Sequence, residues 1–195
     1  MIAIPSGPRT AMSRVKRWYL LATSALLVIG VAPQLFAQKT YALGIGGGVA
    51  VPAGKFADTK ATGYSGAVSL AIGSGDIPVG LRIDGIYNRF SRKADATSQQ
   101  TAATSGANVV GGLVDLIYAF PGTTAKAYVI AGVGYYHTKI QGSANNNIGF
   151  NGGVGVTFGA GPIAMFFETR YHSISRNAAE GGVVQFVPVT IGLLF

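Results

Sequence analysis

The sequence contains no cysteine, which excludes disulfides, thiolate metal sites and a cysteine nucleophile. Charged residues make up only 11% of the 195 residues, whereas about 25% is usual for a soluble domain. Because 49% of the residues are hydrophobic and so few are charged, the composition also excludes a disordered chain. The 29 glycines keep no triplet period, which excludes a collagen helix.

Residues 1–37 have the layout of a secretory signal peptide. A basic region that includes Arg14 and Arg17 precedes an apolar run over residues 18–33, and the small residue Ala37 follows. A helix needs about 20 residues to span a bilayer, so this run is short for the alternative, a retained membrane anchor. Cleavage after Ala37 would leave residues 38–195 as a single exported domain. Its net charge falls from +8 to +4, because four basic residues (Arg9, Arg14, Lys16 and Arg17) leave with the signal. No basic cluster with interleaved aromatic residues remains, so we expect no nucleic-acid partner.

From Thr40 onward, large apolar residues alternate with small or polar ones at a period of two, which is the signature of β-strands. Eight such runs follow one another. In the fifth run, near residues 126–138, either face could be the apolar one, and we assign Val129, Ala131, Val133 and Tyr135 to the outward face. The large apolar rows of the other runs begin at these residues: Tyr41, Tyr64, Val79, Val110, Ile148, Ile163 and Val187.

Short and long connections alternate between these runs. Residues 73–76, 121–125 and 159–162 are rich in glycine and proline and predict tight turns. Residues 52–61, 91–105, 139–147 and 176–182 predict longer loops. Three short turns and four long loops, with both termini on the short-turn side, are typical of an up-and-down transmembrane barrel.

The face opposite the apolar rows favours a membrane barrel over a soluble sandwich. It consists mostly of Gly, Ala, Ser and Thr, which would make a poor water-facing surface but fit the narrow interior of an eight-stranded barrel. The few charged residues on that face would need partners inside the barrel. We therefore predict an interior polar network made of Arg82, Asp84, Asp115, Glu168 and Arg170.

Aromatic residues stand near the ends of the apolar rows, as expected for belts at two membrane interfaces. One predicted belt lies by the short turns and comprises Tyr41, Tyr118, Phe120, Phe158 and Phe195. The other lies by the long loops and comprises Tyr64, Tyr87, Tyr135, Phe150 and Tyr171.

Four segments give the chain a resemblance to the small outer-membrane β-barrel domains of Gram-negative bacteria. They are residues 127–135, 149–156, 167–172 and the terminal strand 186–195, which ends Val189, Thr190, Ile191, Gly192, Leu193, Leu194, Phe195. The resemblance implies an all-β, eight-stranded, antiparallel, up-and-down transmembrane barrel in the cell outer membrane. It implies outer-membrane lipid, lipopolysaccharide and the barrel-assembly machinery as partners. It also implies an assembly signal at Val189, Ile191, Leu193 and Phe195.

The fold does not fix one activity. We expect a structural or surface-interaction role, no enzymatic activity, no cofactor or metal, and a monomer whose interior is filled by side chains. The alternatives are a small pore and an enzyme that modifies lipid A, because some barrels of this size are deacylases with a His-x-Ser motif. Here Ser173 follows His172 directly and Ser175 comes three residues later, so both serines lie on the opposite face of the strand from the histidine. The two histidines, His137 and His172, have no carboxylate cluster at the spacing of metal ligands.

Overall fold

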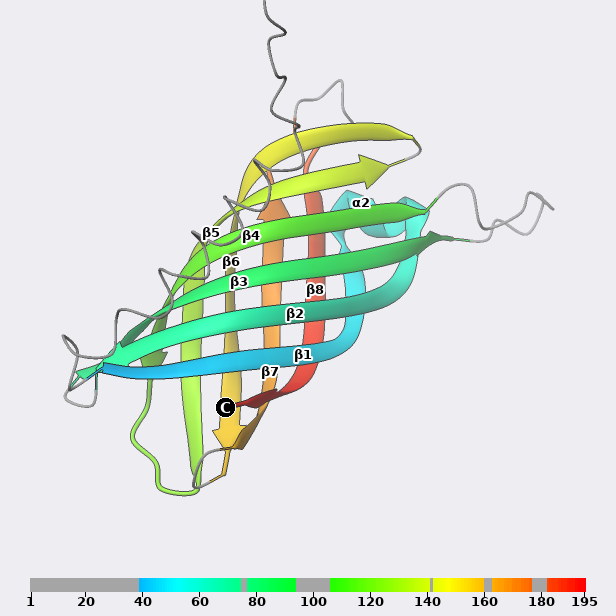
Figure 1. The fold of residues 1–195 in the computed structure, drawn as a ribbon. Coiled ribbons are helices and arrows are strands. Elements are labelled where there is room, and N and C mark those ends of the chain that lie inside the picture. Colours follow the sequence, from blue (N-terminus) through cyan, green and yellow to red (C-terminus); the bar gives the residue numbers. More distant parts are fainter. Residues whose placement is uncertain (1–38, 75–76, 94–105, 141, 160–162, 177–181) are drawn as a thin grey trace, which may run out of the picture. The chain divides into compact units, whose positions relative to one another are not determined.

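In a computed structural model, eight antiparallel strands close into a barrel in which each strand pairs with its neighbours in sequence and β1 pairs with β8 (Figure 1). The structure describes residues 39–74, 77–93, 106–140, 142–159, 163–176 and 182–195. The strands are β1 (Lys39–Ala53), β2 (Lys60–Ser74), β3 (Ile77–Arg92), β4 (Ala107–Ala119), β5 (Ala125–Ile140), β6 (Ser143–Phe158), β7 (Ala164–Ile174) and β8 (Val184–Leu194). The prediction of an eight-stranded antiparallel up-and-down barrel is confirmed. The predicted signal peptide, residues 1–37, lies outside the described residues.

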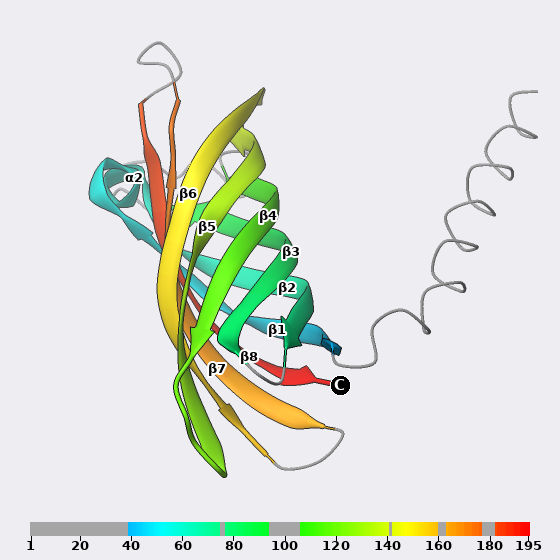
Figure 2. The same ribbon diagram turned by 90° about the vertical axis from the view of Figure 1, so that its left-hand side faces the viewer.

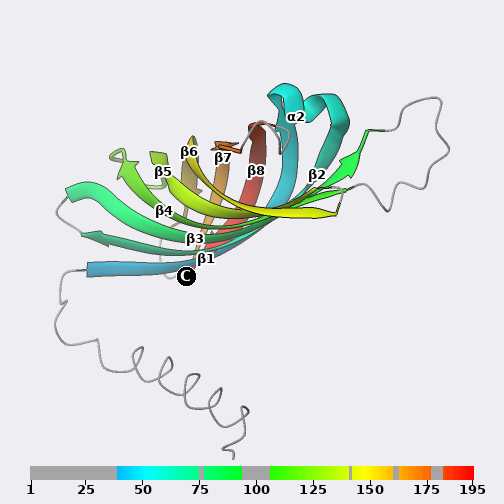
Figure 3. The same ribbon diagram turned by 90° about the horizontal axis from the view of Figure 1, so that it is seen from above.

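A six-residue helix, α2 (Gly54–Thr59), joins β1 to β2. Figure 2 shows this helix at one end of the barrel and the C-terminus at the other, and the view in Figure 3 places α2 beside the ends of β1, β2 and β8. We call these ends the loop end and the short-turn end. Within the described part of the chain, no helix is both long and apolar enough to cross a membrane.

The alternation of the sequence becomes a division between the outside and the inside of the barrel. The burial pattern along β3 switches at every residue from Leu81 to Phe90, with Leu81, Ile83 and Tyr87 exposed. The buried row contains the polar residues Arg82, Asp84 and Asn88 together with Ile86 and Phe90. On the ambiguous fifth strand, Val129, Val133 and Tyr135 are exposed, while Tyr128, Ile130 and Tyr136 are buried. The inward row of β5 therefore carries two tyrosines, and each makes a hydrogen bond inside the barrel: Tyr128 with Glu168 and Tyr136 with His172.

Two of the predicted loops differ in the structure. Residues 139–147, expected as a long loop, instead belong almost entirely to β5 and β6, which extend as a hairpin around Gly142, whose φ is +88°. The polar run of asparagines is typical of a loop, but its backbone pairs with β5 and Asn146 Oδ1 lies 2.7 Å from His137 Nδ1. Residues 52–61, also expected as a loop, contain α2, whose Phe56 is buried. Much of the predicted loops at 91–105 and 176–182 lies outside the described residues.

Glycines on the inner face leave space for the large side chains of neighbouring strands. Gly132 pairs with Asp115 on one side and with Asn151 on the other. A Cβ on Gly132 would collide with the Asp115 carboxylate and with the Val114 carbonyl oxygen. Gly112 is the outward counterpart, because a Cβ there would meet no atom within 4 Å. The same residue type thus has a packing role inside the barrel that it lacks outside.

We predict that Gly132→Ala destabilises the barrel by about 1–3 kcal/mol, because the added methyl group overpacks the interior. The matched control Gly112→Ala should be neutral or stabilising by up to about 1 kcal/mol, because glycine weakens a strand relative to alanine. Urea-induced unfolding of both refolded variants in phospholipid vesicles measures the two changes. Equal effects at the two positions would show that interior space does not constrain Gly132.

Candidate functional site: the closed interior and the apolar outer face

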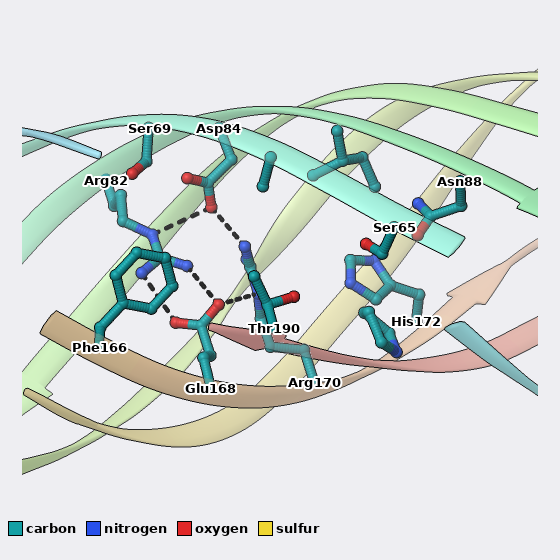
Figure 4. A pocket seen from close by; sticks show the side chains of 13 residues that line it. Ser65, Ser69, Arg82, Asp84, Asn88, Phe166, Glu168, Arg170, His172 and Thr190 are labelled. Carbon is teal, nitrogen blue, oxygen red and sulfur yellow. Dashed lines mark hydrogen bonds and ion pairs between the residues drawn. The ribbon is translucent and has the colours of Figure 1, made fainter. Parts of the chain in front are cut away.

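The five charged residues predicted for the interior all lie inside the barrel and contact one another. Arg82 forms a bidentate pair with Glu168, with both N–O distances 2.8 Å, and its Nε donates to Asp84 Oδ2 at 3.0 Å (Figure 4). Arg170 reaches Asp84 at 2.6 Å, Asp115 at 2.8 Å and Glu168 at 2.9 Å. Each of the five residues is 6% exposed or less. They form a single network in which each arginine contacts at least two carboxylates.

The strand period places these groups across the barrel from one another. Arg82 and Asp84 are two residues apart on β3 and so share its inner face, as Glu168 and Arg170 do on β7. Arg82 of β3 contacts Glu168 of β7, and Arg170 of β7 contacts Asp84 of β3. In each pair the two residues are 86 positions apart in the chain. The pairing therefore links two opposite walls of the barrel.

Neutral side chains donate further hydrogen bonds to two of the three carboxylates. Tyr128 donates its hydroxyl to Glu168 at 2.6 Å, crossing above Gly155, where a Cβ would collide with the tyrosine ring. Asn151 donates its amide to Asp115 at 2.7 Å. Three carboxylates outnumber two arginines, so these two neutral donors supply hydrogen bonds that the arginines do not. Buried charge of this kind is tolerated only when such partners are present.

An aromatic column, defined here as Phe56, Phe90, Phe186, His172 and Tyr136, fills the barrel toward the loop end. The Phe56 and Phe90 rings meet edge to face at 5.1 Å, and Phe90 meets Phe186 at 5.4 Å. Phe186 stacks on His172 with centroids 4.8 Å apart, and His172 Nδ1 lies 2.9 Å from the Tyr136 hydroxyl. The helix α2 supplies Phe56, which is the member of the column at the loop end of the barrel.

The remaining interior space is divided into small volumes. A cavity of about 20 Å³ lies beside the network and has room for a single water molecule. Among the described residues, Asp84 Oδ1 and both amide atoms of Asn88 are buried without a hydrogen-bond partner. A cavity of about 150 Å³ lies between the network and the short-turn end, lined by residues that include Ile117, Lys126, Phe166 and Leu194. The interior is therefore occupied by side chains at its middle and toward its loop end.

The outer face is apolar on all eight strands. Each strand exposes at least one large hydrophobic side chain: Leu43, Val68, Ile83, Leu116, Val133, Phe150, Phe167 and Ile191 in strand order. All ten residues of the two predicted aromatic belts are exposed, with fractions between 37% for Tyr171 and 59% for Tyr135. A water-facing protein surface rarely carries a continuous apolar patch of this kind.

The predicted assembly signal lies on the outer face of β8. Ile191, Leu193 and Phe195 are exposed and Val189 is half-buried. Phe195 closes the barrel through two backbone hydrogen bonds to Leu43, at 2.7 and 2.9 Å. The backbone of the last residue thus extends the pairing of β8 with β1, while its ring is exposed on the outer face.

Sequence reasoning missed the aromatic column. His172 is one of its members, and the sequence raised it only as a possible catalytic or metal-ligating residue, whereas it is 1% exposed between two rings. The inward row of β5 held the available signal, because Tyr128 and Tyr136 alternate with outward residues. Among the described residues, no group of three His, Asp or Glu side chains has a geometry that could hold a metal ion.

We predict that Arg170→Met destabilises the barrel by about 3–5 kcal/mol, because it leaves Asp84 and Asp115 without their shared cation. Adding Asp115→Asn should restore at least about 1 kcal/mol, since one of the stranded charges is removed. A double-mutant cycle based on urea unfolding in vesicles measures this coupling. Strictly additive losses would contradict a shared interior network.

The comparisons with known proteins agree with this geometry. No protein-family model matches the chain, and no curated protein matches it in sequence. In structure it is similar to Neisserial surface protein A, with a TM-score of 0.58 and 17% identity over 80% of this chain and 97% of that one. It is also similar to a major outer membrane protein from Thermus thermophilus, with a TM-score of 0.50 and 10% identity over 80% of this chain and 99% of that one. The chain therefore has the fold of the small outer-membrane β-barrels.

Proposed function

We propose that the protein is an integral outer-membrane barrel with a structural or surface-interaction role, exported by cleavage of residues 1–37. The observation that carries the proposal is the reversed polarity of the barrel, with ion pairs inside and large apolar side chains outside on every strand. Large apolar side chains on the outer face suit hydrocarbon as the surrounding solvent. Closure of the barrel also leaves no sheet edge with unpaired backbone groups, which hydrocarbon could not satisfy. The long-loop side then faces the exterior of the cell, as in other bacterial barrels.

The filled interior favours this role over a pore. Ions crossing the barrel would meet the arginine–carboxylate network and then the aromatic column. An eight-stranded barrel has an interior only wide enough for side chains. We therefore expect the protein to act through its two surfaces, the membrane-facing wall and the loop end.

The position of His172 disfavours the alternative of a lipid-modifying enzyme. Its ring lies inside the barrel between Tyr136 and Phe186, whereas a residue that attacks a lipid ester has to reach the lipid. Ser173 is the next residue on β7 and so points to the opposite face. No nucleophile–base pair of the Ser–His type arises from this segment.

We predict that Val114→Arg destabilises the barrel in vesicles by about 2–4 kcal/mol, because Val114 is the middle member of the outward row from Val110 to Tyr118. Asn108→Arg is the matched control, since Asn108 is on the same face and strand but beyond the apolar row. It should cost no more than about 1 kcal/mol. Urea unfolding in phosphatidylcholine vesicles gives both values, and equal tolerance of arginine at the two positions would argue against a lipid-facing wall.

We further predict that deletion of Phe195 reduces the amount of barrel in outer-membrane fractions of cells more than it lowers the stability of refolded protein. The reason is that the terminal ring is offered to the assembly machinery, while the rest of β8 still pairs with β1 and β7. Phe120→Ala is the control, because it removes another exposed ring at the short-turn end. Quantitative blotting of membrane fractions is compared with heat-modifiable gel mobility. Normal membrane yield of the truncated chain would contradict the assembly role of Phe195.

A further inference from the structure

At the loop end, the outward rows of three adjacent strands change from apolar to cationic or amide side chains. On β3 the exposed Tyr87 is followed by Arg89, and on β4 Val110 is preceded by Asn108. On β5 Tyr135 is followed by His137 and then Lys139. Each strand thus leaves the apolar wall and immediately presents a polar group on the same face.

Strand register places three of these side chains in one row. Arg89 pairs with Asn108, and Asn108 pairs with Lys139. Arg89 and Lys139 are two strand spacings apart, about 10 Å between Cα atoms. An arginine and a lysine side chain can converge over that distance on one anion, with the Asn108 amide between them. We refer to Arg89, Asn108 and Lys139 as the basic row.

The charges of the basic row are not used within the described structure. Within that part of the chain, Arg89 and Lys139 make no hydrogen bond or ion pair with another residue, and both are exposed. The described residues at the loop end carry a single carboxylate, Asp58 of α2, on the segment that joins β1 to β2. The same end carries further exposed cations, including Lys55 and Lys93. Among the described residues, therefore, none neutralises the charges of the basic row, and an external anion can do so.

We propose that the basic row binds the phosphate of a lipid headgroup in the leaflet at the loop end. The inference rests on the proposed function, because it needs the apolar wall to lie in hydrocarbon. The first row beyond that wall then stands at the depth of the headgroups. The Arg89 guanidinium fits a phosphate in a bidentate manner, and Lys139 adds a second charge-assisted contact. A phosphorylated glycolipid of the outer leaflet offers such a group at this depth.

The test uses diphosphoryl lipid A as the probe and the full refolded barrel in dodecyl maltoside micelles, with binding followed by native mass spectrometry. Each basic side chain near a membrane surface contributes separately to the affinity for an anionic lipid. The double variant Arg89→Gln with Lys139→Gln should therefore weaken the binding of lipid A about 30-fold. The matched control, Lys55→Gln with Lys93→Gln, removes the same charge at the same end and should change binding less than about twofold. Heat-modifiable mobility establishes that every variant is folded.

Three outcomes overturn the proposal: unchanged binding by the Arg89/Lys139 variant, an equal loss in both double variants, or displacement of lipid A by millimolar inorganic phosphate. The last would indicate a site for free anions. Flotation of the wild type with phosphatidylcholine vesicles after alkaline extraction tests the proposed function separately. A barrel that floats but ignores lipid A refutes only the basic row, whereas a barrel that is extracted refutes the membrane location itself.

Discussion

The pairing of charges inside a closed tube is the constraint on which the rest of this structure depends. Two arginines and three carboxylates lie in a space from which bulk water is excluded, and their desolvation is compensated only if each keeps its partners. The closed strand order sets β3 opposite β7, and these two strands carry complementary pairs that meet across the barrel. The network also requires glycine at Gly132, which leaves room for the Asp115 carboxylate, and at Gly155, which leaves room for the Tyr128 ring to reach Glu168.

Much of this architecture follows from the sequence because strand periodicity is a local property. The inward position of Arg82 and Glu168 can be deduced from residues two apart, and so can the apolar outer row. Partner choice is different, since Arg82 meets Glu168 from 86 positions away and only the closed barrel brings them together. The prediction of a loop over residues 139–147 was wrong for a related reason, since β5 extends to Ile140 and β6 begins at Ser143. Asparagines favour turns by local preference, but pairing with the facing strand prevails here.

The two surfaces and the interior suit different tasks. The aromatic column and the network occupy the interior, so the chemistry available to the environment is that of the wall and of the loop end. The wall ends in aromatic rings on both sides, which hold a barrel at a defined depth because such rings prefer the membrane interface. At the loop end the cations begin where these rings stop. We propose that such a protein acts through its rim rather than through a passage.

The most direct test of the account is the depth profile of spin labels along β4 in lipid vesicles. The chain has no native cysteine, so single substitutions such as Val114→Cys and Leu113→Cys each provide one unique labelling site. We expect labels on the outward row from Val110 to Tyr118 to be accessible to oxygen and shielded from a water-soluble nickel chelate, with the greatest contrast at Val114. Labels on the inward row should be immobile and shielded from both. Nickel accessibility along the whole outward row would contradict a lipid-embedded barrel.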